Sequence, residues 1–198
     1  MSSPLRFGAY VLVALFGAFE LYTLWLAANP DVPPDYRAYY LTQTTTCLNQ
    51  PVSGAYQGGI LSFLPDGAAA AKPVKVCGWE GPVGDGNHAV GTSARLRFAL
   101  DTPVRNPMLS VEMVAVKKGD IDTQHVDVLV NGEQIGEITV TAGAPQKFEV
   151  PLGTPNAPPG TYDVTFEFPD ALQMGPTDPE TRWRSIKLSA AGIVHASA

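Results

Sequence analysis

The sequence predicts an all-β protein, an antiparallel β-sandwich of the jelly-roll kind, preceded by one transmembrane α-helix. A largely apolar run of 22 residues with a single charged residue lies near the amino terminus. The rest of the chain holds many short segments in which apolar and polar residues alternate, the period of a strand with one buried face. The composition includes 19 Gly and 18 Pro but only 16% charged residues. That balance is typical of short strands joined by many turns rather than of charged surface helices.

The length and charge of the chain limit its organisation and partners. With 198 residues, it accommodates one ordinary domain plus a membrane anchor. The formal net charge is -6, and the Lys and Arg residues are scattered rather than clustered. A nucleic-acid-binding surface needs a basic patch, so the sequence predicts no nucleic-acid partner.

Residues 7–28 form the predicted transmembrane helix. They read FGAYVLVALFGAFELYTLWLAA, and 22 residues at about 1.5 Å each span a bilayer core of roughly 30 Å. The alternative is a cleaved signal peptide, which needs a small residue three positions before the new terminus. Cleavage after Ala18, Ala27 or Ala28 would place Phe16, Trp25 or Leu26 there. The sequence therefore predicts an uncleaved anchor in the lipid bilayer.

The charges flanking this run predict its orientation. Arg6 and the amino terminus precede it, whereas Asp31 and Asp35 outnumber Arg37 in the Pro-rich segment that follows. The positive-inside rule then places residues 1–6 in the cytoplasm. Residues 29–37 become a stiff spacer and residues 38–198 a periplasmic β-sandwich, which locates the protein in a bacterial inner membrane.

Glu20 is the one charged residue inside the apolar run, and no Lys or Arg lies near it in sequence. One interpretation is a protonated carboxyl group that lipid tolerates. The other is a carboxyl group that meets a donor on another membrane protein, since intramembrane acids usually face protein. On a helix, Glu20 shares one side with small residues that allow close approach. The predicted helix-docking residues are Tyr10, Val13, Gly17, Glu20, Leu24 and Ala27.

Strand signals dominate the chain beyond the spacer. The clearest hairpin signal is Asn131-Gly132 between two apolar runs, because a type I′ turn needs positive φ at both central residues. About nine strands and no convincing soluble helix indicate the sandwich. The predicted strands are residues 58–64, 74–79, 93–101, 108–117, 125–131, 134–141, 146–152, 161–168 and 183–194.

The chain contains two cysteines, Cys47 and Cys77. In an extracytoplasmic domain, we expect them to form one disulfide, which would close a loop of about 30 residues and contribute roughly 3 to 4 kcal/mol. The alternative is a pair of buried free thiols. A metal site is not predicted, because no CxxC motif and no neighbouring His is present.

No motif of a known enzyme class occurs, and the three histidines are far apart in sequence. We therefore predict no catalytic residues, no cofactor and no catalytic metal. Asp170, Asp178 and Glu180 fall in one loop and offer oxygen ligands for a structural Ca²⁺, although their spacing is not that of a recognised calcium loop.

Two tryptophans and two arginines form the predicted contact surface for a glycan or a partner. These residues are Trp79, Arg182, Trp183 and Arg184. If Ile186 and Leu188 face the core, Trp183 faces outward with Ser185 and Lys187 as a platform for a sugar ring or a protein. The alternative is a break in strand register that lets Trp183 cap the core. Trp79 is interpreted first as a core residue and second as a contact.

The segments GWEGP, ARLRFAL, MLSVEMVAV, VDVLVNGEQIGEITV, TYDVTFEFPDA and DPETRWRSIKL follow one another between Val76 and Val194. In this order they resemble the jelly-roll, carbohydrate-binding-module-like domains in the extracytoplasmic parts of bacterial membrane glycosyltransferases and polysaccharide-assembly proteins. The resemblance implies a sandwich with a glycan surface. It supplies no catalytic residue, and this chain lacks the multi-pass catalytic part of those proteins.

These observations predict two alternative functions. In the first, the chain is a non-catalytic accessory subunit: its helix docks on an integral membrane protein or complex, and its sandwich stabilises or caps that partner. In the second, it is a membrane-tethered glycan-binding module in envelope polysaccharide assembly.

Overall fold

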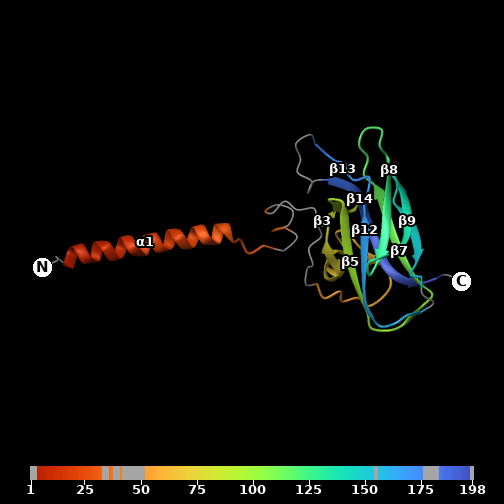
Figure 1. The fold of residues 1–198 in the computed structure, drawn as a ribbon, viewed down its shortest axis with the longest axis horizontal. Coiled ribbons are helices and arrows are strands. Elements are labelled where there is room, and N and C mark those ends of the chain that lie inside the picture. Colours follow the sequence, from red (N-terminus) through yellow and green to blue (C-terminus); the bar gives the residue numbers. More distant parts are fainter. Residues whose placement is uncertain are drawn as a thin grey trace. The chain divides into compact units, whose positions relative to one another are not determined.

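The computed structural model describes residues 4–32, 36–37, 41, 52–153, 156–175 and 183–196. The chain divides into two compact units, Met1–Pro33 and Pro34–Ala198. The first contains one long helix, and the second consists mainly of β-sheets (Figure 1).

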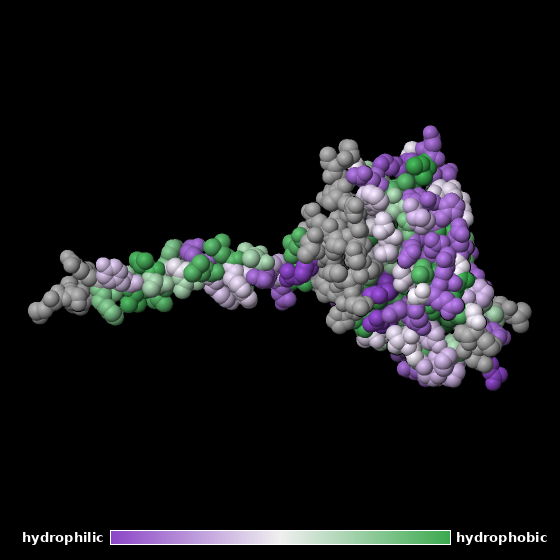
Figure 2. Space-filling model, viewed as in Figure 1, coloured by the Kyte–Doolittle hydropathy of each residue, from purple (hydrophilic) through white to green (hydrophobic). Residues whose placement is uncertain are grey.

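Helix α1 covers Pro4–Ala28 and contains the predicted apolar run. Its Phe7–Ala28 stretch is long and apolar enough to cross a membrane or to serve as a signal sequence. The helix surface is largely hydrophobic (Figure 2). The helix ends where the Asn29 backbone N–H and side-chain amide both donate to the Trp25 carbonyl oxygen, at 2.9 and 3.0 Å. Pro30 follows and lacks the N–H that a further turn needs.

The second unit contains a five-stranded antiparallel sheet with the order β2-β5-β12-β8-β9. The strands cover Lys75–Cys77, Ser93–Leu100, Gly160–Glu167, Thr123–Val130 and Glu133–Thr141, respectively. Buried residues alternate with partly exposed ones along β5, β12 and β8, so each strand has one face in the core and one at the surface.

The opposing sheet has the order β10-β7-β14-β4-β3. These strands cover Gln146–Pro151, Pro107–Ala115, Trp183–His195, Gly86–Val90 and Trp79–Val83. Two short strands, β1 (Leu61–Ser62) and β13 (Leu172–Gln173), also pair with β14. A separate two-stranded sheet joins β6 (Val104–Arg105) to β11 (Asn156–Ala157). A short helix, α3 (Ala68–Ala71), and a 3₁₀ turn, η2 (Lys72–Val74), lead into β2.

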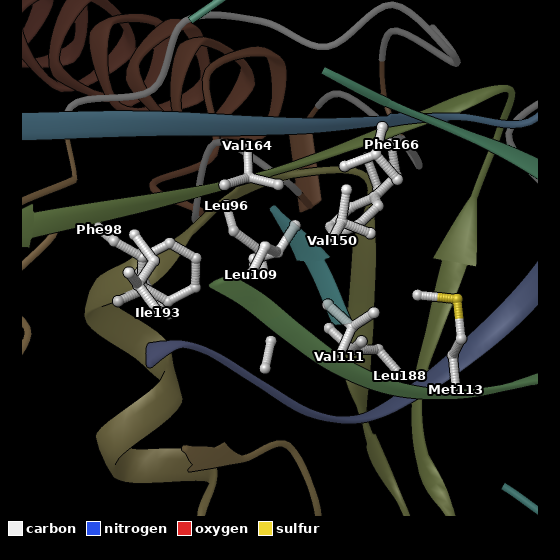
Figure 3. Close-up of a cluster of buried hydrophobic side chains, with 14 of the residues drawn as sticks. Leu96, Phe98, Leu109, Val111, Met113, Val150, Val164, Phe166, Leu188 and Ile193 are labelled. Carbon is white, nitrogen blue, oxygen red and sulfur yellow. The ribbon is translucent and has the colours of Figure 1, made fainter. Parts of the chain in front are cut away.

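The core lies between the two main sheets (Figure 3). Leu96, Phe98, Val164 and Phe166 come from the five-stranded sheet and are fully buried, with relative exposures of 0%. They belong to one hydrophobic cluster with residues of the opposing sheet, including Leu109, Val111, Met113, Leu188 and Ile193. The two apolar faces therefore form a single sandwich core.

The predicted all-β sandwich with one amino-terminal apolar helix is confirmed. The hairpin at Asn131-Gly132 is also confirmed: the turn joins β8 to β9, and the two residues have φ values of 51° and 86°. These are the positive angles that a type I′ turn requires. The domain boundaries expected from the sequence stay a prediction.

Two strand predictions differ from the structure. Of residues 58–64, only Leu61 and Ser62 form a strand. The strand predicted for residues 74–79 stops at Cys77, because Gly78 has a φ of 80° and turns the chain into the β3–β4 hairpin. A side chain at Gly78 would also overlap the Ser93 carbonyl oxygen, so the bend depends on glycine.

Candidate binding site

A hollow of about 350 Å³ opens on the outer side of the five-stranded sheet, at the end where β5 begins and β12 finishes. We call it the polar hollow. Its lining residues are Thr92, Ser93, Asp127, Glu167, Phe168 and Pro169. Figure 2 shows hydrophilic residues gathered over the part of the domain where Figure 1 places β8 and β9.

Strand alternation turns the polar side chains of the hollow outward. Ala94, Val126, Val128, Phe166 and Phe168 are buried, with exposures of 0 to 1%. Their neighbours Ser93, Asp127 and Glu167 must then point to the other face of the sheet. The Phe168 backbone N–H donates a 2.8 Å hydrogen bond to the Thr92 carbonyl oxygen. This bond joins the residue after β12 to the residue before β5.

The cross-strand register brings these polar residues together. Glu167 of β12 lies directly opposite Ser93 of β5 on one side and Asp127 of β8 on the other. Directly opposed residues have Cβ atoms about 5 Å apart. The Gln134 side-chain amide donates to Asp127 Oδ1 at 3.0 Å and fixes that carboxylate. The hollow therefore offers carboxylate acceptors beside hydroxyls that both donate and accept.

Two ion pairs involve strands of the same sheet: Arg97 of β5 pairs with Asp163 of β12, and His125 of β8 pairs with Asp170, which follows β12. The Arg97 guanidinium binds both carboxylate oxygens of Asp163, at 2.7 and 2.9 Å. His125 Nδ1 lies 2.5 Å from Asp170 Oδ2. The hydrogen bond to Asp170 raises the pKa of His125, and the same bond lowers the pKa of Asp170.

The structure corrects the contact role considered for Trp79. Its side chain is 2% exposed and packs edge-to-face on Phe166 with ring centroids 6.0 Å apart. The indole Nε1 donates to the Arg95 carbonyl oxygen at 3.1 Å. Trp79 is thus a core residue with a satisfied N–H, and it has no surface to offer a glycan or a partner.

The structure also corrects the face predicted for the last strand. Ser185 and Ile186 are both fully buried, although they are adjacent. This departure from alternation coincides with a shift in the register between β14 and β4 at residues 184–187. Trp183 is partly buried, and Ser185 is not on an outward face with it. Arg182 lies outside the described residues.

The remaining predicted contact residue, Arg184, belongs to a charged cluster on β3, β4 and β14. Arg184 forms an ion pair with Glu80, and Lys187 forms one with Asp85. His88 lies opposite Lys187 in the β14–β4 pairing. Burial lowers the pKa of His88, and the charges of Lys187 and Arg184 lower it further.

The other predicted sites are placed as follows. Cys77 is buried and has no free thiol, while Cys47 lies outside the described residues, so their pairing stays a prediction. Asp178 and Glu180 also lie outside the described residues, and Asp170 is engaged by His125. Within the described part of the chain, no group of three His, Cys, Asp or Glu residues could hold a metal ion.

The predicted docking residues all lie on α1. Tyr10, Val13 and Leu24 are exposed, and an added Cβ at Gly17 would meet nothing within 4 Å. Within the described residues, the Glu20 carboxylate has no hydrogen-bond partner, and the Thr23 hydroxyl donates to the Glu20 carbonyl oxygen at 2.8 Å.

The polar hollow was not predictable from the sequence. Its residues come from three strands that are far apart in sequence, and only the pairing register brings them together. The one usable signal was that Ser93, Asp127 and Glu167 each occupy a polar position beside buried apolar residues.

Comparisons with known proteins found no matching protein-family model and no matching curated protein. Among solved structures, the chain is similar to the CBM36-1 domain of a multidomain xylanase from the hindgut metagenome of Trinervitermes trinervoides. The identity is 12% and the TM-score 0.41, over 72% of this chain and all of that one.

Two further carbohydrate-binding modules are similar. One is a CBM36 in complex with calcium and xylotriose, with 14% identity and a TM-score of 0.40 over 68% of this chain and 98% of that one. The other is a family 35 module from Clostridium thermocellum, with 8% identity and a TM-score of 0.42 over 71% and 100%. All three TM-scores are below 0.5.

Proposed function

We propose that the chain is a membrane-anchored, non-catalytic module that binds a glycan in the polar hollow. The single observation that carries the proposal is the convergence of Asp127, Glu167 and Ser93 from three strands on one hollow of about 350 Å³. This volume lies at the lower end of the range for small-molecule sites, about 300 to 1,000 Å³.

The chemistry of the lining favours a ligand rich in hydroxyl groups. Carboxylates accept hydrogen bonds from hydroxyls, and hydrogen bonds to charged groups are roughly twice as strong as neutral ones. The hydroxyls of Thr92 and Ser93 both donate and accept. An apolar ligand would displace water from these groups without replacing its hydrogen bonds, at a cost of about 1 to 3 kcal/mol for each group left unsatisfied.

The remaining elements of the proposal come from the sequence. Helix α1 anchors the chain in a bacterial inner membrane, with the amino terminus in the cytoplasm and the sandwich in the periplasm. The charge bias around the helix supports this orientation. The module would then bind envelope polysaccharide.

The test is titration calorimetry of the full chain with oligosaccharides. The detergent must lack a sugar headgroup, because such a headgroup would compete for the hollow. We expect binding that Glu167→Gln and Asp127→Asn each weaken about tenfold, equivalent to roughly 1.4 kcal/mol. Asp101→Asn is the matched control, since Asp101 follows the far end of β5. Absence of binding to any oligosaccharide would overturn the proposal.

The same titrations include Trp183→Ala, because Trp183 is the other proposed glycan contact. Loss of binding in Trp183→Ala with unchanged binding in Glu167→Gln would move the site from the hollow to β14.

A second candidate function is the accessory subunit, in which α1 docks on an integral membrane protein. The observation that favours it is Glu20, a carboxyl group within an apolar helix and on the same side as Gly17. The chain offers the Glu20 carboxylate no partner within the described residues, and an added Cβ at Gly17 meets nothing. A partner helix could approach closely there and supply a hydrogen bond.

Pulldown of the full chain from native membranes in mild detergent tests this function. We expect Glu20→Leu to lose a membrane protein that the wild type retains, and Glu20→Gln to keep it, because Gln still forms hydrogen bonds. Val11→Ala is the control, as position 11 lies about 180° from Glu20 on the helix. Identical recovery by the wild type and Glu20→Leu would exclude docking through Glu20.

A further inference from the structure

Four outward residues form one straight row across the five-stranded sheet. Ser93 of β5 pairs with Glu167 of β12, which pairs with Asp127 of β8, which pairs with Glu137 of β9. The residues flanking each member in sequence are buried on at least one side, so all four side chains share the outer face. Three adjacent strands therefore present carboxylates in direct register, and two of these carboxylates line the polar hollow.

Among the described residues, the basic side chains on this face have partners within the chain. Arg97 is held by both oxygens of Asp163, and His125 is bound to Asp170. Arg95, two residues along β5 from Ser93, also has a partner within the chain. Gln134, which donates to Asp127, is neutral. Within the described residues, Glu167 and Asp127 have no ion-pair partner, so no described cation neutralises these two carboxylates of the polar hollow.

This register costs folding free energy, since like charges directly opposite one another in a sheet repel. A ligand that carries a positive charge would relieve the repulsion, whereas an anionic ligand would increase it. At a separation of 4 Å near a protein surface, two unit charges interact by about 4 kcal/mol before desolvation. The charge of the ligand is therefore the property to which the hollow is most sensitive.

We infer that Asp127 and Glu167 determine the specificity of the polar hollow: it binds glycans with free amino groups best, neutral glycans less well, and uronic-acid or sulfated glycans least. This inference rests on the proposed function. The expected ligands are therefore polymers that contain de-N-acetylated amino sugars. In such a sugar the protonated amine lies beside hydroxyl groups, so the lining can bind both the positive charge and the hydroxyls.

Three probes of equal length and linkage test the inference with the full chain. They are β-1,4-linked tetramers of glucosamine, glucose and glucuronic acid, titrated at about pH 6, where amines are protonated and carboxylates ionised. EDTA is present so that no divalent cation neutralises the row. We expect the glucosamine tetramer to bind at least about tenfold more tightly than the glucuronic acid tetramer. This ratio should shrink at high salt, as screening predicts.

Variants separate the hollow from the general charge of the chain. Because the net charge is -6, any cation is attracted weakly over the whole surface. Glu167→Gln and Asp101→Asn each remove one negative charge, but only the first lies in the hollow. We expect Glu167→Gln to reduce the ratio severalfold and Asp101→Asn to leave it unchanged.

The outcomes distinguish the two claims. Binding of all three tetramers with equal affinity, or a ratio that Glu167→Gln does not alter, overturns the inference and leaves the proposed function standing. Binding of no tetramer and of no other oligosaccharide overturns the proposed function, and the inference falls with it.

Discussion

The side chains of Gln124 and Ser185 link the two sheets inside the sandwich. The Ser185 hydroxyl on β14 donates a 2.9 Å hydrogen bond to Gln124 Oε1 on β8. Both residues are fully buried, with exposures of 0%. Gln124 Nε2 has no hydrogen-bond partner among the described residues. This hydrogen bond therefore offsets the desolvation cost of burying the two side chains. For the Gln124 amide it offsets only part of that cost, because Nε2 has no partner among the described residues.

A double-mutant cycle measures this link. Ser185→Ala leaves the Gln124 carboxamide buried without any partner, and we expect a loss of about 1 to 3 kcal/mol in unfolding free energy. Gln124→Leu should cost less, because it also removes an unsatisfied donor. The double variant should be more stable than the sum of the single effects predicts. Strict additivity in denaturant unfolding of the full chain would show that the two side chains do not interact.

Gly192 gives a prediction of a different kind. An added Cβ there would overlap the Gly59 carbonyl oxygen and lie 2.8 Å from the Tyr56 hydroxyl. That hydroxyl accepts a 2.9 Å hydrogen bond from the Ile193 N–H and donates to Gly59, which fastens the segment before β1 to β14. We expect Gly192→Ala to destabilise the domain by about 2 to 3 kcal/mol.

The matched control is Gly81→Ala on β3, where an added Cβ meets nothing within 4 Å. Thermal unfolding should show Gly81→Ala close to the wild type. Equal unfolding temperatures for the wild type and Gly192→Ala would mean that the Tyr56 segment does not pack on β14 as described.

These two relationships show what the sequence could and could not predict. The Asn131-Gly132 hairpin was predictable because its signal lies within four residues. The contact of Gly192 with Gly59, like that of Gln124 with Ser185, joins segments far apart in the chain. Local alternation carries no information on which strands become neighbours, and this also concealed the polar hollow.

The last strand shows a second limit. Strict alternation from Ile186 and Leu188 places Ser185 outward, and the structure places it inward because β14 shifts its register against β4. A shift of this kind depends on the partner strand, so the sequence of β14 alone could only offer the two alternatives for Trp183.

His88 predicts loss of stability on acidification. Burial and the neighbouring Lys187 and Arg184 lower its pKa in the folded state, whereas Glu80 and Asp85 oppose this effect. In the unfolded chain, the pKa is near about 6.5, so the unfolded state takes up the proton first. The contribution of neutral His88 to the free energy of unfolding is therefore complete above about pH 6.5. It declines as the pH falls toward the folded-state pKa.

We therefore expect His88→Gln to unfold with a weaker dependence on pH than the wild type in the acidic range below about pH 6.5. Unfolding temperatures of the full chain across this range are the measurement. The same slope in both proteins would contradict a lowered pKa for His88.

His125 predicts the opposite dependence on the alkaline side. Its hydrogen bond to Asp170 raises its pKa, and the charges of Asp170, Glu137 and Asp127 contribute in the same direction. The stabilisation is complete below the unfolded-state pKa of about 6.5 and is lost as the pH rises through the folded-state pKa. Asp170, whose pKa is lowered, loses its contribution as the pH falls through its own folded-state pKa.

The pair should therefore stabilise the domain most between these two limits. His125→Gln and Asp170→Asn should both remove the decline in stability above neutral pH. NMR titration of the His125 ring in the full chain measures the pKa directly, and a value at or below that of an unfolded histidine would refute the ion pair.

The final prediction concerns Cys47 and Cys77. Cys77 ends β2, is 6% exposed and has no free thiol. A disulfide with Cys47 would close a loop of about 30 residues and should contribute roughly 3 to 4 kcal/mol by limiting the unfolded chain. We expect the unreduced protein to lack two thiol hydrogens by mass spectrometry, and a reductant to lower its unfolding temperature. Cys47→Ser, in contrast, should be insensitive to the reductant.

The oxidation state also reports on orientation, because disulfides persist in the periplasm and are rare in the cytoplasm. Protein taken directly from membranes into a thiol-alkylating reagent preserves the state in the cell. Modification of both cysteines, without prior reduction, would contradict the disulfide and count against a periplasmic sandwich. Modification only after reduction would support the orientation predicted from Arg6, Asp31 and Asp35.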